Sequence, residues 1–323
     1  MLVSRYSNLL CERYSSHDAG WGCSLRSLQS LLASALLTRL DPEEVAKTLL
    51  SPRGALSFAS LLSHGGGWIP GKWMGPHQVT SHLGGWILPS SIRVVFCSGG
   101  VIDMTSLPVE GPWPVLLLIP LRLNPDSYLT VPEVRALLGL MRDQAFCGMI
   151  GGPPGRCTFI LGPQDNANEG GRHWDEVVVL DPHTVKPECR EVKELLSALQ
   201  PQDPPLTLRL TQCSSSFALA LLIRDASELE VLRKGKFDEK GCWMGLSCLT
   251  LMSIHHPPVI SSCEEGLSEP GEEWVDLGAH YIEQANSATS YAVASPPLHG
   301  FRLGRLGWAL LAALSPYFSS KKN

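Results

Sequence analysis

The chain has 323 residues, a formal net charge of −5 and 44% apolar residues, which is enough for one large domain or two with an ordinary core. This charge balance gives no reason to expect nucleic acid as a partner. Ten cysteines are scattered without a C-x-x-C pair, so neither a zinc module nor a secreted disulfide framework is indicated. We therefore expect no metal and no cofactor.

A glycine-rich turn followed by an amphipathic helix is the first informative feature in chain order. The turn is Gly20-Trp21-Gly22, and Cys23 follows it in the first helical turn. Unpaired backbone N–H groups and the helix dipole favour a thiolate there, so Cys23 is the candidate nucleophile. The alternative is an ordinary buried cysteine. Arg26 and Gln29 lie off the apolar stripe of this helix, which consists of Leu25, Leu28, Leu32 and Leu36.

The middle of the chain predicts a mixed fold. Asp41 and Pro42 are typical of a helix start, and that helix continues to Leu50. Residues 51–114 are rich in Gly, Pro and Ser and predict loops around short helices. A further helix is expected over Pro132 to Gln144. The best strand candidates are 115–121, 159–161, 177–180 and 217–223. These elements predict an α+β fold in which an N-terminal helix packs on a sheet.

A buried strand at 177–180 leads directly into Asp181-Pro182-His183. Residues i and i+2 of an extended segment point to the same face, so Asp181 and His183 are expected side by side. A carboxylate can hold an imidazole in one orientation while the imidazole takes a proton from a thiol. The alternative is a turn formed for purely local reasons.

The end of the chain differs in composition. Residues beyond about 250 have linker-like composition, which places a catalytic domain at 1–250 and a linker and tail at 251–323. A short apolar stretch, 306–314, has basic neighbours and predicts either a terminal helix or transient contact with an anionic membrane surface. It is too short to span a bilayer. The N-terminus lacks the apolar run of a secretory signal, so we expect a cytoplasmic protein.

Several blocks together resemble the autophagins, the papain-like cysteine peptidases of autophagy. The resemblance covers roughly residues 1–235, with a weaker match at Gly71-Lys72-Trp73-Met74-Gly75-Pro76 and at 216–220. The four strongest blocks are Gly20-Trp21-Gly22-Cys23 with Leu25-Arg26 and Gln29, Trp113 to Leu123, Ile150-Gly151-Gly152, and Leu180-Asp181-Pro182-His183-Thr184. The resemblance implies a papain-like fold, with the nucleophile on an N-terminal helix that packs on a mostly antiparallel sheet.

The resemblance also implies roles for individual residues. Cys23 would be the nucleophile, His183 the general base and then acid, and Asp181 the residue that orients His183. Trp113 would correspond to the tryptophan that lies over the active-site cleft and narrows it. Tyr6 would correspond to a tyrosine that helps hold the oxyanion, with Tyr14 as the alternative candidate.

The implied reaction is hydrolysis after a C-terminal glycine of a ubiquitin-like autophagy modifier of the GABARAP type. This reaction would serve both precursor processing and release of the modifier from phosphatidylethanolamine. In the tail, Trp274 and Leu277 follow two acidic residues. This pattern is similar to the short motif that adds a strand to the modifier and fills two of its apolar pockets. Coincidence is the alternative for so short a pattern.

Two rival functions remain open on the sequence. Proteases for the ubiquitin-fold modifier share a Gly-Trp-Gly-Cys start and an Asp-Pro-His strand end, whereas the block from Trp113 to Leu123 favours the autophagins. The second rival is a catalytically silent scaffold that binds the modifier through Trp274 and Leu277.

Overall fold

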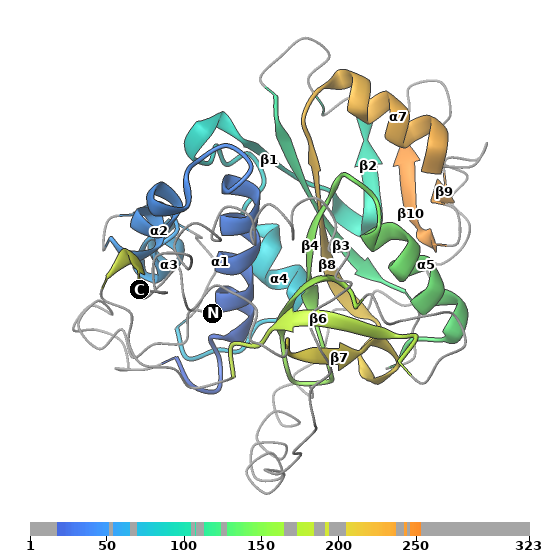
Figure 1. Cartoon of the computed structure of the whole chain (residues 1–323), viewed down its shortest axis with the longest axis horizontal. Helices are drawn as coiled ribbons and strands as arrows, with labels where there is room; N and C mark the ends of the chain where they lie inside the picture. The colour runs from blue at the N-terminus through green and yellow to red at the C-terminus, as the bar shows by residue number, and fades with distance from the viewer. Residues whose placement is uncertain are drawn as a thin grey trace, which may run out of the picture.

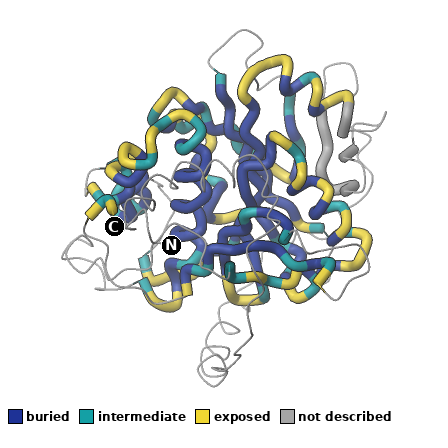
Figure 2. Tube along the Cα trace, viewed as in Figure 1, coloured by how far each residue is buried: buried dark blue, intermediate teal, exposed yellow. Residues whose placement is uncertain are grey.

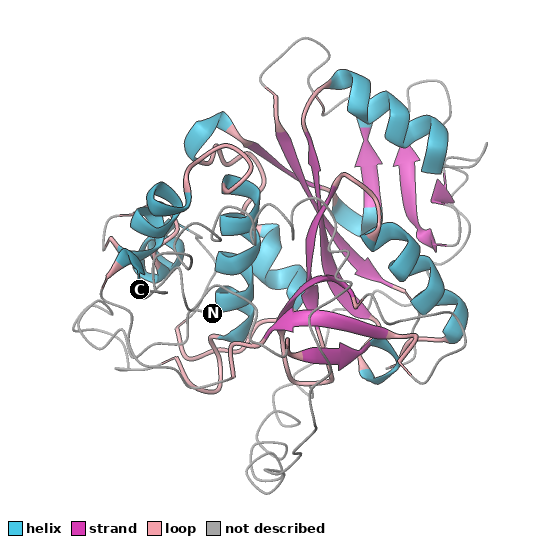
Figure 3. Cartoon of the chain, in the orientation of Figure 1, coloured by secondary structure: helices cyan, strands magenta, loops and turns pink. Residues whose placement is uncertain are grey.

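Helices lie on both sides of a central sheet in this computed structural model (Figure 1). Figure 3 shows the same arrangement by secondary structure. The structure describes residues 18–51, 54–64, 70–104, 107, 113–123, 128–164, 173–183, 191–193, 205–236, 242–243 and 246–252. The helices are α1 (Cys23–Leu36), α2 (Pro42–Leu50), α3 (Phe58–His64), α4 (Pro76–Ser81), α5 (Val131–Met141) and α7 (Ala226–Lys236), with short 3-10 turns η1 (Pro89–Ser91), η2 (Ser98–Gly100) and η4 (Leu210–Gln212).

The main sheet has seven strands among the described residues, in the order β1-β3-β8-β4-β5-β6-β7. Only the pairing of β1 with β3 is parallel, and the other neighbours are antiparallel. The strands are β1 (Arg93–Phe96), β3 (Val115–Arg122), β4 (Phe146–Gly151), β5 (Thr158–Pro163), β6 (Glu176–Leu180), β7 (Thr207–Arg209) and β8 (Ser216–Ile223). This is the mostly antiparallel sheet of an α+β papain-like fold, as the sequence predicts.

The central strands are buried on both faces, which is why they have nearly continuous apolar sequences (Figure 2). Successive side chains alternate between two core clusters. Leu116 and Leu118 of β3 belong to the cluster that contains α1, whereas Val115 and Leu117 belong to the cluster that contains α5. We call these the α1-side core and the α5-side core. The face of the sheet on which a side chain lies therefore decides to which core it belongs.

Helix α1 is buried along its whole length after Cys23, because every residue from Ser24 to Leu36 is buried. Strands β4 and β5 cover one side, and α2, α3 and α4 pack on others. Arg26 and Gln29 do lie off the leucine stripe, but they are only 2% and 0% exposed. The helix therefore has no solvent-facing polar side, unlike an ordinary surface amphipathic helix.

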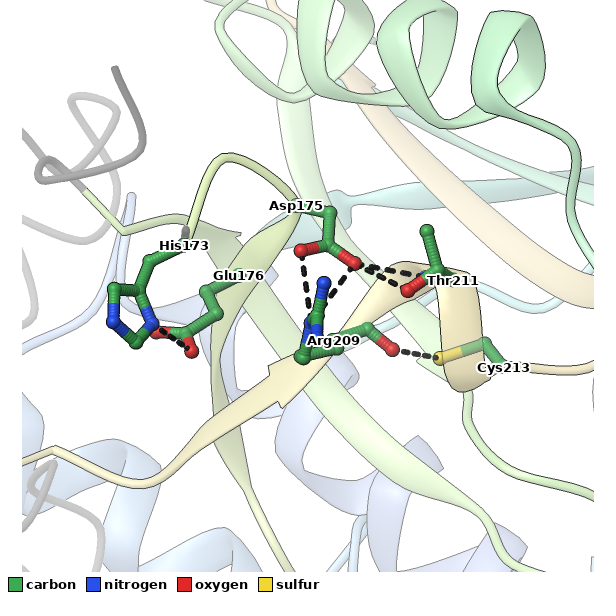
Figure 4. Close-up of polar contacts among 6 residues, drawn as sticks. All are labelled: His173, Asp175, Glu176, Arg209, Thr211 and Cys213. Carbon is green, nitrogen blue, oxygen red and sulfur yellow. Dashed lines mark hydrogen bonds and ion pairs between the residues drawn. The ribbon is translucent and has the colours of Figure 1, made fainter. Parts of the chain in front are cut away.

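A buried carboxylate joins the start of β6 to the end of β7 (Figure 4). Asp175 is fully buried and accepts a hydrogen bond from Arg209 Nε at 3.0 Å. Its second oxygen accepts hydrogen bonds from the backbone N–H and the hydroxyl of Thr211. The Cys213 thiol in turn lies 3.6 Å from the Arg209 carbonyl oxygen, to which it donates. This cluster fixes the edge of the sheet at the end of β6 opposite to Asp181.

A second sheet has three strands in the described residues, in the order β2-β10-β9. Strand β10 (Leu246–Met252) pairs in parallel with β2 (Val101–Asp103) and antiparallel with β9 (Cys242–Trp243). The boundary predicted at residue 250 thus falls inside β10, and it remains a prediction. The tail motif and the apolar stretch 306–314 lie outside the described residues.

The predicted helices and strands are found at their expected places, with ends that differ by a few residues. The Gly-rich region 51–114 contains the predicted short helices and also β1 and β2, which the sequence analysis did not identify. Helix α7 and strands β7, β9 and β10 were not predicted either, and neither was β4. Its sequence, Phe146–Gly151, carries two glycines, and Gly148 has a φ of +139°, so its composition does not look like a strand.

In the part of the chain that the structure describes, no helix combines the length and the apolar character needed to cross a membrane.

Candidate active site

A tight turn places Cys23 at the first position of α1. The Asp18 carbonyl oxygen accepts hydrogen bonds from the N–H groups of Trp21 at 3.3 Å and Gly22 at 2.9 Å. Gly20 has a φ of +85°, a conformation that glycine adopts without strain. Trp21 is 5% exposed, and its ring packs 5.6 Å from that of Phe58. Cys23 is left partly exposed beside N–H groups that have no partner within the helix.

Asp181 and His183 meet directly after β6. The His183 ring nitrogen Nδ1 lies 2.6 Å from Asp181 Oδ1, and the same oxygen accepts the His183 backbone N–H at 2.9 Å. The two residues lie in a turn and not in an extended strand. The contact expected from their spacing is therefore present, but a local turn produces it. The sequence left two interpretations open, a paired Asp and His or a local turn. In the structure both features are present, because the turn itself forms the pair.

His183 also contacts Cys23. Burial by itself would lower the pKa of His183, but hydrogen bonds to Asp181 and Cys23, together with their negative charges, raise it to about 9. The fold thus brings together three side chains that lie up to 160 positions apart in the sequence. An imidazole next to a cysteine sulfur is the arrangement in which a base can activate a nucleophile.

The Asp181 carboxylate stays ionised in this site. Burial opposes ionisation, but the hydrogen bonds from the His183 side chain and backbone outweigh it and lower the pKa of Asp181. The positive charges of His183 and of Arg156, which lies on the loop before β5, act in the same direction. An ionised Asp181 fixes Nδ1 as the protonated nitrogen, which leaves Nε2 for proton transfer.

Four other cysteines are held as thiols. Burial raises the pKa of Cys97, Cys147 and Cys213 to about 12. Cys157 lies near Cys23, and burial followed by the charge of Cys23 holds its pKa well above the usual range. These four thiols are buried, whereas Cys23 is partly exposed. The environment therefore favours Cys23 as the nucleophile.

Trp73 is the tryptophan that contacts Cys23. Its indole Nε1–H donates to Cys23 Sγ at 3.3 Å, and the side chain is 39% exposed. The Ser24 hydroxyl donates to the Met74 carbonyl oxygen at 2.6 Å, which ties the Trp73 loop to the start of α1. Trp113, which the resemblance suggested for this place, packs against the α5-side core, whereas Cys23 packs against the α1-side core.

The contact of Trp73, and not Trp113, with the sulfur has a geometric reason. Trp113 immediately precedes β3, and its position in the alternation shares the face of Val115 and Leu117. The sequence did contain a signal for Trp73, because the block from Gly71 to Pro76 was among the weaker matches. That block could not indicate which side chain reaches the sulfur.

Four further residues singled out on the sequence lie outside the described residues: Tyr6, Tyr14, Trp274 and Leu277. Their assignments stay predictions. Within the described ranges, no three His, Cys, Asp or Glu side chains are grouped so that they could hold a metal ion. The chemistry available at the described site is that of a cysteine sulfur, an imidazole and a carboxylate in contact, next to the first turn of a helix.

Comparison with known proteins assigns this arrangement to a family. The family model of the peptidase C54 catalytic domain matches residues 5–235. A probable cysteine protease atg4 of Sclerotinia sclerotiorum is 27% identical over 257 residues, which are 69% of this chain and 56% of the relative. A cysteine protease ATG4 of Medicago truncatula is 30% identical over 222 residues, or 54% of this chain and 43% of the relative. The corresponding protein of Pyricularia oryzae is 31% identical over 196 residues, or 53% and 39%. The chain spans about half the length of these relatives.

Trp73→Phe should slow the alkylation of Cys23, because phenylalanine keeps the ring but removes the N–H that donates to the sulfur. We expect a roughly threefold to tenfold lower rate at neutral pH, which corresponds to a hydrogen bond worth about 1 kcal/mol. The measurement is mass spectrometry of the peptide that contains Cys23 after timed iodoacetamide treatment. Trp113→Phe is the matched control and should leave the rate unchanged; the opposite pattern would return the cleft position to Trp113.

The contribution of His183 to folding stability should depend on pH. Since folding raises the pKa of His183 from 6.5 to about 9, this contribution is fully present below 6.5 and is lost as the pH rises through about 9. Urea unfolding of the native chain and of His183→Gln should therefore give a larger stability difference below 6.5 than above 9. His173→Gln removes an imidazole that also contacts a carboxylate, Glu176, but is 63% exposed. This control removes an imidazole–carboxylate contact away from the site, where water screens the ion pair. Equal pH dependence in both variants would contradict the assignment.

Proposed function

Because the chain belongs to the peptidase C54 family, the autophagins, we propose that it is a cysteine peptidase with Cys23 as nucleophile, His183 as general base and acid, and Asp181 as the residue that orients His183. The observation that carries the proposal is the contact of His183 with both Cys23 and Asp181. A catalytically silent scaffold would have no need for this contact.

The mechanism follows from the positions of these groups. The Cys23 thiolate attacks the carbonyl carbon of the substrate glycine, and the N–H groups of the first turn of α1 face the oxyanion that forms. Protonated His183 then gives its proton to the leaving amine, and the C–N bond breaks. Neutral His183 next takes a proton from water, and the resulting hydroxide releases the acyl group from the sulfur. Asp181 keeps the imidazole in one tautomer throughout.

The proposed substrate is a ubiquitin-like autophagy modifier of the GABARAP type, cleaved after its C-terminal glycine. Trp73 supports this choice, because its indole lies directly against the nucleophile, where a glycine without a side chain would be the easiest residue to accommodate. The leaving amine can belong to a peptide or to phosphatidylethanolamine, so one site would serve precursor processing and release from the lipid. The second reaction would require transient contact with a membrane surface.

The remaining assignments complete the proposal. Tyr6 would assist the oxyanion, and Trp274 with Leu277 would bind the modifier outside the active site. The catalytic domain would comprise residues 1–250, with 251–323 as linker and tail. The protein would act in the cytoplasm, where its thiols stay reduced.

Cys23→Ala should abolish cleavage of a GABARAP-type modifier precursor, because no other described thiol shares the contact with His183. The measurement is gel electrophoresis of the precursor after incubation with enzyme. Cys213→Ser is the matched control, since a hydroxyl can also donate to the Arg209 carbonyl, and it should retain turnover.

The same assay separates the rival functions. Cleavage of only the ubiquitin-fold modifier precursor would assign the chain to that substrate. Binding of the autophagy modifier without cleavage of either precursor, by the native chain, would indicate a silent scaffold.

The double variant Trp274→Ala with Leu277→Ala should weaken binding of the modifier to Cys23→Ala protein by roughly tenfold or more, because two aromatic or aliphatic anchors would leave their pockets. Isothermal titration calorimetry measures this change. Cleavage of a short peptide with the same glycine should be unaffected in the background that retains Cys23, since the motif lies outside the active site. Unchanged modifier affinity would show that the motif is coincidental.

A further inference from the structure

We propose that the buried ion pair between Asp18 and Arg26 positions the turn that carries Cys23, so that both side chains are positioning residues of this active site. The inference rests on the proposed function for its kinetic test. The effect of this pair would be exerted through the backbone of residues 18–22.

Arg26 is the buried partner in this ion pair. Its side chain is 2% exposed, and Nε donates to Asp18 Oδ2 at 2.6 Å. Arg26 lies three positions after Cys23 on α1, so the two residues are neighbours on the helix surface. A charge this deeply buried is retained only with a partner, and Asp18 supplies that partner from the segment before the helix.

Further contacts fix the guanidinium plane. Nη1 of Arg26 donates to Gln29 Oε1 at 3.1 Å, and Gln29 Nε2 donates to the Leu56 carbonyl oxygen at 2.7 Å. The guanidinium carbon lies 4.1 Å from the centroid of the Phe58 ring. Phe58 also packs on Trp21 of the turn. The guanidinium is therefore held by α1, by the segment at residues 56–58 and by the turn at the same time.

Asp18 holds the turn from the other side. Its carbonyl oxygen accepts the N–H groups of Trp21 and Gly22, while its carboxylate folds back toward Arg26. A Cβ added to Gly22 would lie 2.6 Å from the Asp18 Cβ and 2.7 Å from Oδ2. The carboxylate can occupy this place only because residue 22 has no side chain. The Gly22 carbonyl oxygen in turn accepts the Arg26 N–H at 2.9 Å, so the turn is also bonded to the backbone of Arg26.

A positioning role explains this pair better than stability alone does. A buried ion pair is weak evidence for stability, because desolvation offsets the attraction between the charges. Asp175 and Arg209 also form an ion pair with a fully buried carboxylate, but Arg209 is half exposed and the pair lies at the end of β6 opposite to Asp181 (Figure 4). The Asp18–Arg26 pair instead joins the two ends of the segment that delivers Cys23 and its backbone donors. Catalysis is sensitive to shifts of such groups by about 1 Å.

Arg26→Lys is the first test, since lysine keeps the charge but cannot donate in the two fixed directions of a guanidinium. With the modifier precursor as substrate, we expect kcat to fall by about tenfold to a hundredfold, while KM changes by less than about threefold. Arg209→Lys is the matched control: it makes the same substitution in an ion pair away from Cys23 and should leave kcat unchanged. An Arg26→Lys protein with native circular dichroism and unchanged kcat would overturn the inference.

Asp18→Asn and Asp18→Ala form a second pair of variants. Both remove the charge, but asparagine keeps an oxygen that can accept the Arg26 Nε–H. We expect Asp18→Asn to retain more of the native kcat than Asp18→Ala. Equal kcat values in both, at equal fractions of folded protein, would contradict the role assigned to this hydrogen bond.

Gly22→Ala tests the geometry without altering any charge, and it also serves if the Arg26 and Asp18 variants do not fold. Gly22 has a φ of −86°, which alanine adopts freely, so the added methyl group acts only by displacing the Asp18 side chain. We expect a loss of kcat similar to that of Arg26→Lys. Gly139→Ala is the control, because a Cβ at Gly139 in α5 meets no atom within 4 Å, and it should keep native kcat. Native kcat in Gly22→Ala would overturn the inference.

A readout without substrate separates this inference from the proposed function. The alkylation rate of Cys23 by iodoacetamide at neutral pH should fall in Arg26→Lys and Gly22→Ala, but not in the two controls. If the native chain cleaves neither modifier precursor, the proposed function fails while this measurement still decides the inference. If cleavage is normal and alkylation is unchanged in folded Arg26→Lys and Gly22→Ala, the inference fails by itself.

Discussion

The anchoring of α1 by its own polar side chains is the constraint on which the site depends. Because the helix is buried on all sides after Cys23, each of its polar side chains must find a partner inside the protein. Several of them donate to backbone carbonyl oxygens of surrounding segments. Ser27 reaches Cys157, Ser34 reaches Cys147, and Gln29 reaches Leu56. These bonds fix the rotation of the helix and its position along its axis, and thereby the place of Cys23.

His183, the partner of Cys23, lies just after a strand of the main sheet. Strand β6 lies next to β5, and β5 packs on α1, so the end of β6 and the start of α1 meet at one edge of the α1-side core. Asp181 and His183 then need only a local turn to present the imidazole to the sulfur. Long-range packing therefore brings His183 close to Cys23, and a short turn orients its imidazole. A carboxylate bound twice by the same residue is well suited to hold that orientation.

Two tryptophans, Trp73 and Trp113, lie on opposite sides of the sheet. Trp113 precedes a strand whose alternation directs it to the α5-side core, while Trp73 precedes α4 on the side of α1. Both belong to segments that resemble the family, and composition does not distinguish them. The loop of Trp73 is joined to α1 through Ser24 and Met74. This contact brings the indole to Cys23, and no pattern in the local sequence announces it.

The sequence by itself determined the class of fold, the main helices and strands, and the identity of Cys23, Asp181 and His183 as candidates, because periodicity, turn chemistry and family-like blocks are local properties. Strand β4, which carries two glycines, and the short strands β1 and β2 were not predicted, since such segments become strands only when neighbours supply their hydrogen bonds. Only the tertiary structure decided which tryptophan faces the sulfur and that Arg26 and Gln29 are buried. The physical reason is that burial and contact across a sheet depend on which segments pack together, and that packing is set by the whole chain at once.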